Sequence, residues 1–157
     1  DKKVYCWGYE TAIGNGVGPS TNISILTLVT AGFPSNYEAK SVFASQTQTC
    51  ALLIDNSLWC WVGDNGGALE TKKYYSGNAS APLSNTPVAV TFTNSVDVTD
   101  VSVGNNGICA VSRTGAAYCW AHNTGNQLGI TTSTADQYQT GTTATGYMLP
   151  AKVIDPQ

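Results

Sequence analysis

The five cysteines are the residues of this 157-residue sequence whose type and spacing could support chemistry, either as disulfides or as metal ligands. Four of them form two pairs ten positions apart, Cys50 with Cys60 and Cys109 with Cys119, while Cys6 has no such partner. Each second cysteine, and Cys6 too, is followed at once by tryptophan. A zinc site needs closely spaced Cys or His pairs such as C-x-x-C, and the sequence has none. We therefore expect disulfides in preference to free or metal-bound thiols.

Antiparallel hairpins would position these cysteine pairs. If the cysteines of the later pair lie opposite each other, residues 113–115 form a three-residue loop, with Gly115 where such loops place a left-handed residue. The same register in the earlier pair puts Asn56 at that position, and Asn is the next best residue there. Directly opposed residues at a non-hydrogen-bonded site are close enough for a disulfide. The register therefore predicts one disulfide within each pair.

No other set of side chains has the pattern of a catalytic, metal or cofactor site. His122 is the single histidine, and it follows Trp120 in a segment that we expect to be an exposed turn. A Ser-His-Asp site would need partners for this imidazole, and no G-x-S-x-G element accompanies it. The ten carboxylates form no recognisable catalytic pair. We expect a protein that is not an enzyme and that holds no metal or cofactor.

Composition excludes two classes of partner. Charged residues make up 11% of the chain, compared with about 25% in typical soluble domains, and the net charge is −3. The seven Lys and Arg residues are scattered, whereas nucleic-acid binding needs them clustered. No apolar run approaches the roughly 20 residues of a membrane-spanning helix. We expect neither nucleic acid as a partner nor insertion into a membrane.

Further strands with period-two alternation precede each hairpin. The nearer strands contain Val101 and Val103 before the later hairpin, and Val42 and Ala44 before the earlier one. Farther upstream lie a proline-opened strand at residues 87–90 and a weaker counterpart at residues 25–29. Because proline is tolerated at the start of a strand or on an edge, these strands suit an outer position in a small sheet. Each repeat thus offers about four short antiparallel strands.

The repeat as a whole resembles a known family. A glycine-rich turn follows each hairpin tryptophan, at residues 121–129 and 62–70, although Ala121 and Val62 replace its first glycine. Together with the C-A-x-x-x-x-x-x-x-x-C-W hairpin, this resembles the regulator-of-chromosome-condensation (RCC1-like) repeat, most strongly over residues 42–129. The resemblance implies an all-β protein built from propeller blades of four antiparallel strands.

Applied to the whole chain, the repeat gives about three blades in one domain. The predicted division is a partial blade at 1–20, blades at 23–70 and 86–129, and a partial blade at 148–157. Trp7, Trp61 and Trp120 are equivalent in the repeat, and we expect all three to pack in the core or between blades. Closed propellers typically have four to eight blades. The chain is therefore expected to belong to a larger propeller or to close a ring as a homo-oligomer, a dimer or trimer, with Cys6 unpaired or bonded to another chain.

These features favour a secreted or cell-surface recognition module. Its partner would be a protein or glycan of another cell, bound by an adhesin-like or fibre-tip propeller through long connections that we expect to be surface loops, residues 69–86 and 129–149. The expected binding residues are Lys72, Lys73, Tyr74, Tyr75, Tyr138 and Tyr147. The alternative is a protein inhibitor or regulator that blocks an enzyme with one propeller face, as the resemblance to β-lactamase-inhibitor relatives of the repeat implies.

Overall fold

The computed structural model describes residues 1–8, 13–15, 23–45, 48–62, 85–104, 107–123, 125–130, 137–140 and 143–154. This part of the chain is all-β, and it contains no helix that could cross a membrane. Its strands are β1 (Tyr5–Gly8), β2 (Ile23–Leu28), β3 (Ala39–Ala44), β4 (Gln48–Leu53), β5 (Leu58–Val62), β6 (Val88–Ala89), β7 (Val98–Val103), β8 (Gly107–Ser112), β9 (Ala117–His122), β10 (Gln137–Thr140) and β11 (Thr143–Lys152).

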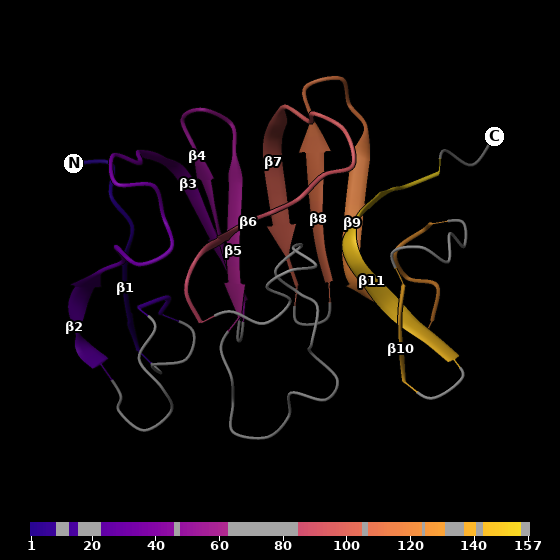
Figure 1. Cartoon of the computed structure of the whole chain (residues 1–157), viewed down its shortest axis with the longest axis horizontal. Coiled ribbons are helices and arrows are strands. Elements are labelled where there is room, and N and C mark those ends of the chain that lie inside the picture. The colour runs from indigo at the N-terminus through magenta and orange to yellow at the C-terminus, as the bar shows by residue number, and fades with distance from the viewer. Residues whose placement is uncertain are drawn as a thin grey trace.

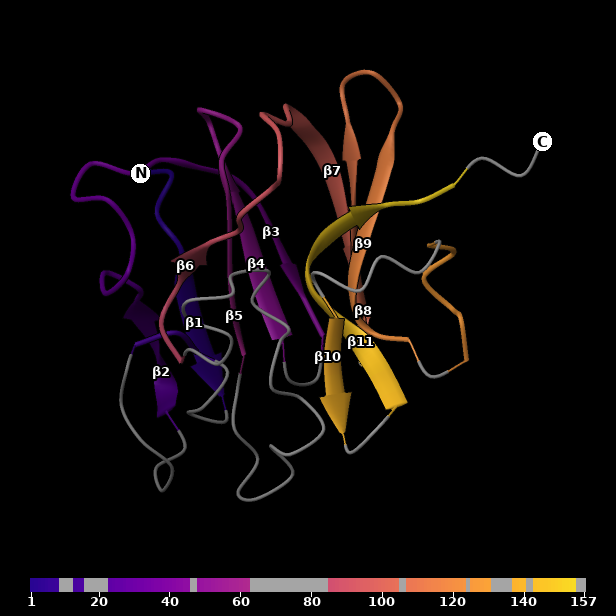
Figure 2. The same ribbon diagram turned by 45° about the vertical axis from the view of Figure 1, so that its right-hand side comes forward.

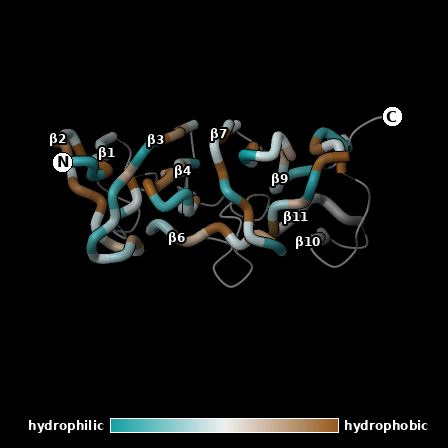
Figure 3. Tube along the Cα trace, turned by 90° about the horizontal axis from the view of Figure 1, so that it is seen from above, coloured by the Kyte–Doolittle hydropathy of each residue, from teal (hydrophilic) through white to brown (hydrophobic). Residues whose placement is uncertain are grey.

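The strands form three antiparallel sheets that stand side by side in a row (Figure 1). The first sheet has only β1 and β2, the second has the order β3-β4-β5-β6, and the third has the order β10-β11-β9-β8-β7. Seen from above, the sheets follow one another from the N-terminal end of the row to the C-terminal end (Figure 3). The arrangement confirms the all-β class and the four-stranded blades predicted from the repeat.

The two cysteine hairpins have the predicted geometry. Cys50 faces Cys60 across β4 and β5, and Cys109 faces Cys119 across β8 and β9. Both pairs are disulfide-bonded, with Cα atoms 4.1 Å apart. The loop residues also behave as expected.

The three-residue loop 113–115 is closed by a hydrogen bond from the Ser112 N–H to the Ala116 carbonyl oxygen. Gly115 has a φ of 83° and Asn56 a φ of 62°, so both adopt the left-handed conformation. The register that predicted the disulfides is thereby confirmed.

β4 is the central strand of the fold because it contributes to two hydrophobic cores. All six of its residues are buried. Cys50 and Leu52 face the core shared with the third sheet, whereas Ala51 and Leu53 face the core shared with the first sheet. Successive side chains of a strand point to opposite faces, so burial on both sides fits the apolar residues 50–53, which follow the buried polar residues Gln48 and Thr49.

The outer sheets are less completely buried than β4. In β8, Ile108, Ala110 and Ser112 are buried, while Val111 between them is 39% exposed. The first sheet leaves Ile25 and Leu26 of β2 71% and 62% exposed. The middle sheet is therefore covered on both faces, and β2, whose neighbouring residues Ile25 and Leu26 point to opposite faces, is more open than β8.

The sheets are offset from the sequence repeats. The proline-opened strand at Val88–Ala89 is β6, and it pairs with β5 of the preceding hairpin instead of joining the next one. β2 pairs in the same way with β1. A repeat period places strands along the chain, but pairing is decided by which edge is free when the sheet is assembled. The second and third sheets thus each combine the hairpin of one repeat with the first strand of the next.

The C-terminal segment differs from the sequence expectation in two ways. Leu149–Lys152 belongs to β11 and pairs with β9, so it completes the third sheet and does not open another blade. Residues 129–149 were expected to be a loop, but they include β10 and most of β11, which lie together at the outer edge of the third sheet (Figure 2). Threonine and tyrosine favour strands, and here they outweigh the polar, loop-like composition.

The three equivalent tryptophans are not equally buried. Trp61 and Trp120 are fully buried, as expected, but Trp7 is 64% exposed. Sequence equivalence predicts the position of a side chain within its own sheet. It does not reveal whether a neighbouring blade is present to cover it.

A buried hydroxyl holds the first sheet in place. The Val29 N–H donates to the Val4 carbonyl oxygen, and the Tyr37 hydroxyl donates to the Val29 carbonyl and accepts from the Val4 N–H. Tyr37 also stacks on Phe33, with ring centroids 4.1 Å apart. Burial of the Tyr37 hydroxyl raises its pKa. The two-stranded sheet is thus tied by buried contacts to the connection that leads into β3.

One buried alanine has a glycine-like conformation. Ala121, which replaces the first glycine of the turn, has a φ of 90°, and Gly8 at the equivalent position has a φ of 115°. Such backbone strain costs about 1 to 3 kcal/mol in a residue with a Cβ atom. We expect Ala121→Gly to raise the free energy of unfolding by about 1 kcal/mol, since relief of strain exceeds the added entropy of the unfolded chain.

Ala110→Gly is the matched control for this prediction. Ala110 is also fully buried, but it lies in the middle of β8 and outside the positive-φ region. Glycine there should destabilise the protein by about 0.5 to 1 kcal/mol. Urea unfolding of both variants measures the difference, and two changes of the same sign would contradict the strain at Ala121.

Candidate recognition surface at the β4–β5 turn

The turn between β4 and β5 projects from one end of the second sheet (Figure 1). Hydrogen bonds from the Leu53 N–H to the Ser57 carbonyl and from the Asn56 N–H to the Leu53 carbonyl fix its backbone. Ile54 at the start of the turn is 54% exposed, which is high for a large aliphatic side chain. The turn therefore presents an apolar side chain from a rigid support.

Two grooves, each of about 350 Å³, flank this turn. The first is lined by the connection between β2 and β3 together with the start of the turn: Pro34, Ser35, Asn36, Tyr37, Glu38, Leu53, Ile54 and Asp55. The second is lined by the end of the turn and the connection between β6 and β7: Asn56, Ser57, Leu58, Ala89, Val90, Phe92, Thr93, Asn94, Ser95 and Val96. Both mix apolar surface with hydroxyl and amide groups.

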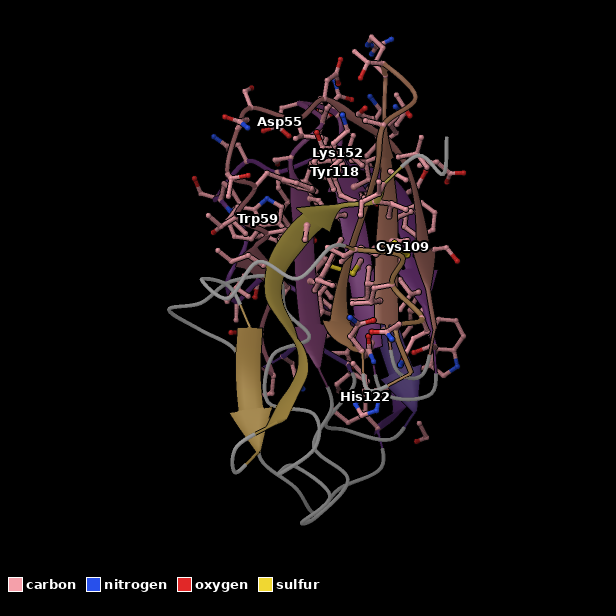
Figure 4. The ribbon with its side chains drawn as sticks, turned by 90° about the vertical axis from the view of Figure 1, so that its right-hand side faces the viewer. Asp55, Trp59, Cys109, Tyr118, His122 and Lys152 are labelled. Carbon is pink, nitrogen blue, oxygen red and sulfur yellow. A yellow bond between two sulfur atoms is a disulfide. The ribbon has the colours of Figure 1, made fainter. Side chains whose placement is uncertain are left out.

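A chain of hydrogen bonds orders the polar groups of the turn. The Trp59 indole N–H donates to Ser57 Oγ over 3.0 Å, and the Ser57 hydroxyl donates to Asp55 Oδ1 over 2.6 Å. The Ser57 backbone N–H donates to the same carboxylate oxygen over 2.9 Å. Figure 4 shows Asp55 and Trp59 on the same side of the molecule, at the left of the view. The carboxylate is thus held in one orientation before any partner arrives.

These hydrogen bonds change the acidity of Asp55. The Ser57 hydroxyl, followed by the Ser57 N–H, lowers the pKa of the Asp55 carboxyl because both donate to its charged form. Since the folded-state pKa lies below the unfolded one, the linked stabilisation is present above the unfolded pKa. It is lost as the pH falls through the folded value. Asp55 therefore stays a hydrogen-bond acceptor at neutral and mildly acidic pH.

We expect Ser57→Ala to raise the pKa of Asp55 toward the ordinary value of about 3.9, because the hydroxyl donor is lost while the backbone donor remains. Carboxyl carbon chemical shifts followed against pH measure this change. Ser95→Ala, which removes a hydroxyl that lines the same groove as Ser57, should leave the Asp55 titration unaltered. An unchanged pKa in Ser57→Ala would contradict the assigned role of the hydroxyl.

Glu38 provides a second carboxylate in the first groove. It forms an exposed ion pair with Lys2 over 2.9 Å, and the Lys2 ammonium lowers the pKa of Glu38 mainly through this hydrogen bond. The Ile54 N–H donates to the Glu38 carbonyl oxygen, which ties the groove wall to the turn. Because Lys2 already pairs with Glu38, the ionised Asp55 beside the exposed isoleucine is the carboxylate that suits a basic and partly apolar segment.

The single histidine lies away from this surface. His122 ends β9 opposite Gly146 and is half-buried, so the expected exposed turn position is wrong. Figure 4 places Asp55 and His122 at opposite ends of the molecule, which leaves no Asp–His pair between them. Within the described ranges, no group of three or more His, Cys, Asp or Glu residues could hold a metal ion.

The binding residues predicted from sequence fall largely outside the described part. Lys72, Lys73, Tyr74 and Tyr75 all lie in the segment 63–84, which is not among the described residues. Tyr138 lies on β10 opposite Gly146, and Tyr147 lies on β11 opposite Gln137. The structure thus brings the last two tyrosines onto neighbouring strands, not into a loop.

Sequence reasoning missed the residues that form the grooves. Pro34, Ser35 and Asn36 in one connection, and Thr93, Asn94 and Ser95 in the other, had no repeat motif to distinguish them. Their turn-forming composition was the available signal, because such triplets mark a connection between strands. Which connections flank the same hairpin depends on sheet order, and that order is set by non-local pairing.

Comparison with known proteins identifies the architecture. The sequence matches no protein-family model and no curated protein. The fold matches a chain in the crystal structure of Kap60 bound to yeast RCC1 (Prp20), with a TM-score of 0.70 over 97% of this chain and 19% sequence identity. The chain has the RCC1-like β-propeller fold. This confirms the resemblance inferred from the cysteine hairpins.

Two further structures share the RCC1-like fold. Human WBSCR16 matches with a TM-score of 0.67 at 19% identity over 98% of this chain. Prp20p from Saccharomyces cerevisiae matches with a TM-score of 0.62 at 15% identity over 96%. In all three comparisons the chain spans 33% of the other chain, or about a third of an RCC1-like propeller of that length.

Proposed function

We propose that this chain is a protein-binding part of an RCC1-like propeller, and that the β4–β5 turn with its two grooves is the contact surface. The observation that carries the proposal is the exposed Ile54 on a fixed turn between two grooves. A large aliphatic group that protrudes from a polar rim is a typical anchor of a protein interface.

The charges around the turn indicate the chemistry of the partner. Asp55 is held ionised without a basic partner among its hydrogen bonds, Glu38 is ionised and paired with Lys2, and the chain carries a net charge of −3. A partner segment with Lys or Arg beside an apolar residue would match the first groove. Because these carboxylates are exposed, their contribution should act mainly on the association rate and fall with added salt.

The neighbours in fold support a protein as the ligand. One is a structure of RCC1 in complex with Kap60, and Prp20p is described together with its binding properties to Gsp1p and histones. Their low identity transfers no specific partner to this chain. What carries over is the use of the same fold to bind proteins, and we propose no catalytic activity for this chain.

We place this function outside the cell. Two disulfides clasp the complete blades, and disulfides persist in secreted and surface proteins while they are rare in reducing compartments. In that setting the module would recognise a protein of another surface, as an adhesin does. Glycan binding through the tyrosine-bearing segments remains a prediction that needs its own ligand assay.

The experiment is a selection from a random peptide library displayed on phage, against residues 1–157. We expect enriched peptides that combine Lys or Arg with an apolar residue. Ile54→Asp should weaken their binding about tenfold or more, the size of a typical interface anchor. Ile154→Asp is the matched control, since Ile154 is also exposed, at 45%, but does not line either groove. Equal binding by both variants would remove the turn from the proposal.

A further inference from the structure

Three strands occupy the same place in their sheets. β1, β5 and β9 each carry a cysteine followed by a tryptophan, and each pairs in the same register with the next strand of its sheet. The matching pairs are Cys6 with Thr27, Cys60 with Val88, and Cys119 with Ala151. β1 is therefore the structural equivalent of the two disulfide-bearing strands.

The other edge distinguishes β1 from its equivalents. On that edge β5 pairs with β4, and β9 pairs with β8. β4 and β8 carry the partner cysteines, with Cα atoms 4.1 Å from those of Cys60 and Cys119. In the described part of the chain, β1 pairs only with β2. Of the five cysteines, only Cys6 is free.

The backbone of β1 is ready for a further strand. The Val29 N–H donates to the Val4 carbonyl, and Cys6 lies opposite Thr27 two positions along. Because alternate residues of an antiparallel strand direct their hydrogen-bonding groups to the same side, those of Tyr5 between them face away from β2. The equivalent groups of Trp59 face β4, where Trp59 lies opposite Ala51.

The exposure of Trp7 is an independent indication that the first sheet has an uncovered surface. Its equivalents Trp61 and Trp120 are fully buried, whereas Trp7 is 64% exposed. Trp61 is covered by the segment that follows β1: Gly14 approaches so closely that a Cβ atom there would lie 2.7 Å from Trp61 Nε1, and Ile13 beside it is buried. Trp7 would be covered in the same way by a segment from a preceding blade.

We propose that the open edge of β1 binds a β-hairpin equivalent to β3–β4 and β7–β8, antiparallel and with its single cysteine opposite Cys6, and that the two cysteines form a disulfide. The occupant comes from polypeptide outside residues 1–157. Both hairpins of this kind within the chain have their cysteines bonded, and β4 and β8 have a strand on each edge. The matched propellers, about three times as long, leave room for it.

The covalent step needs a named oxidant, and glutathione disulfide supplies it. The thiolate of the incoming strand attacks glutathione disulfide, which forms a mixed disulfide and releases one glutathione. Cys6 as thiolate then attacks the incoming strand's sulfur, the Cys6 disulfide forms, and the second glutathione leaves. The two thiols together lose two electrons and two protons, and glutathione disulfide takes them up as it is reduced to two glutathione molecules. Burial raises the pKa of the Cys6 thiol and so lowers its thiolate fraction. Small oxidants in solution should therefore react with Cys6 slowly.

The test uses a synthetic peptide with the sequence of residues 39–53, which spans β3 and β4 and has one cysteine, at the position of Cys50. The peptide is mixed with residues 1–157 in a glutathione redox buffer, and adducts are located by mass spectrometry. We expect a disulfide-linked adduct at Cys6, about tenfold or more above that of a scrambled peptide with the same composition. The amide of Tyr5 should also become protected from hydrogen exchange in the adduct.

Three results would overturn the proposal. One is an equal yield with the scrambled peptide, which would mean that Cys6 reacts without strand docking. Another is an adduct in which Tyr5 still exchanges freely. The third is a covalent homodimer through Cys6 that forms in place of the peptide adduct, because the occupant would then be a second copy of this chain. Cys6→Ser, which should form no adduct, confirms the site of reaction.

Discussion

Trp61→Ala is expected to lower the free energy of unfolding by about 3 to 5 kcal/mol, whereas Trp7→Ala should change it by no more than about 0.5 kcal/mol. The two residues are equivalent in the repeat, and their surroundings differ. Trp61 is fully buried, contacts Phe33 edge-on with ring centroids 6.0 Å apart, and lies under Gly14. Trp7 is 64% exposed. Urea unfolding of the two variants measures the contrast.

Milder and matched variants keep this prediction testable. A loss of about 3 to 5 kcal/mol is a large fraction of the stability of a small domain, so Trp61→Ala could fail to fold. Trp61→Phe retains an aromatic ring and should show a smaller loss of the same sign. Trp120→Ala, at the third equivalent position and also fully buried, should resemble Trp61→Ala. Equal losses at Trp7 and Trp61 would contradict the open face of the first sheet.

Gly32→Ala is expected to cost about 3 kcal/mol or more, because it combines backbone strain with a collision. Gly32 has a φ of 84°, where a Cβ atom is disfavoured. A Cβ atom at this position would also lie 2.1 Å from the Pro87 carbonyl oxygen, and both groups are backbone. The contact joins the connection after β2 to the start of β6. The segment around Gly32 would have to move. Because Phe33 is the next residue, this movement would take its ring out of contact with Tyr37 and Trp59.

Gly115→Ala separates the two contributions. Gly115 has nearly the same φ, 83°, but nothing lies within 4 Å of the Cβ position. It should therefore show the conformational cost alone, about 1 to 2 kcal/mol. Thermal or urea unfolding of both variants gives the comparison. If Gly32→Ala cost no more than Gly115→Ala, the close contact with Pro87 would be disproved.

The local parts of the fold could be predicted from the sequence. The cysteine spacing determines the register of each hairpin, the register determines the loop, and the loop requires a residue such as Gly115 or Asn56 with positive φ. Each of these steps involves residues within about a dozen positions of one another. For the same reason, both disulfides could be assigned before the structure was known.

The pairing between repeats could not be predicted in the same way. β6 and β11 read as first strands of new blades, yet they close the sheets of the preceding hairpins. Their sequences are compatible with pairing at the edge of any neighbouring sheet. The partner of each strand therefore depends on which sheet has an unpaired edge strand. β10 and most of β11 were mistaken for a loop because they are rich in Thr and Gln, which are common in loops as well as in strands.

The candidate site was the least predictable part. Asp55 neighbours the predicted loop residue Asn56, but the two grooves that flank this turn are lined by two connections about sixty residues apart in the sequence, which only sheet order brings to the same turn. Trp7 illustrates the converse. Its repeat position predicted burial, whereas the exposed side chain became the strongest indication of a docking edge.

Hydrogen exchange at one repeat position tests the central claim most directly, namely that two complete blades are joined to a half-blade open at β1. Tyr5, Trp59 and Tyr118 are equivalent, and each precedes the cysteine of its strand. The amides of Trp59 and Tyr118 face β4 and β8 and should exchange slowly, while the Tyr5 amide should exchange close to the rate of an unprotected amide. A Tyr5 amide as protected as that of Trp59 would contradict the account.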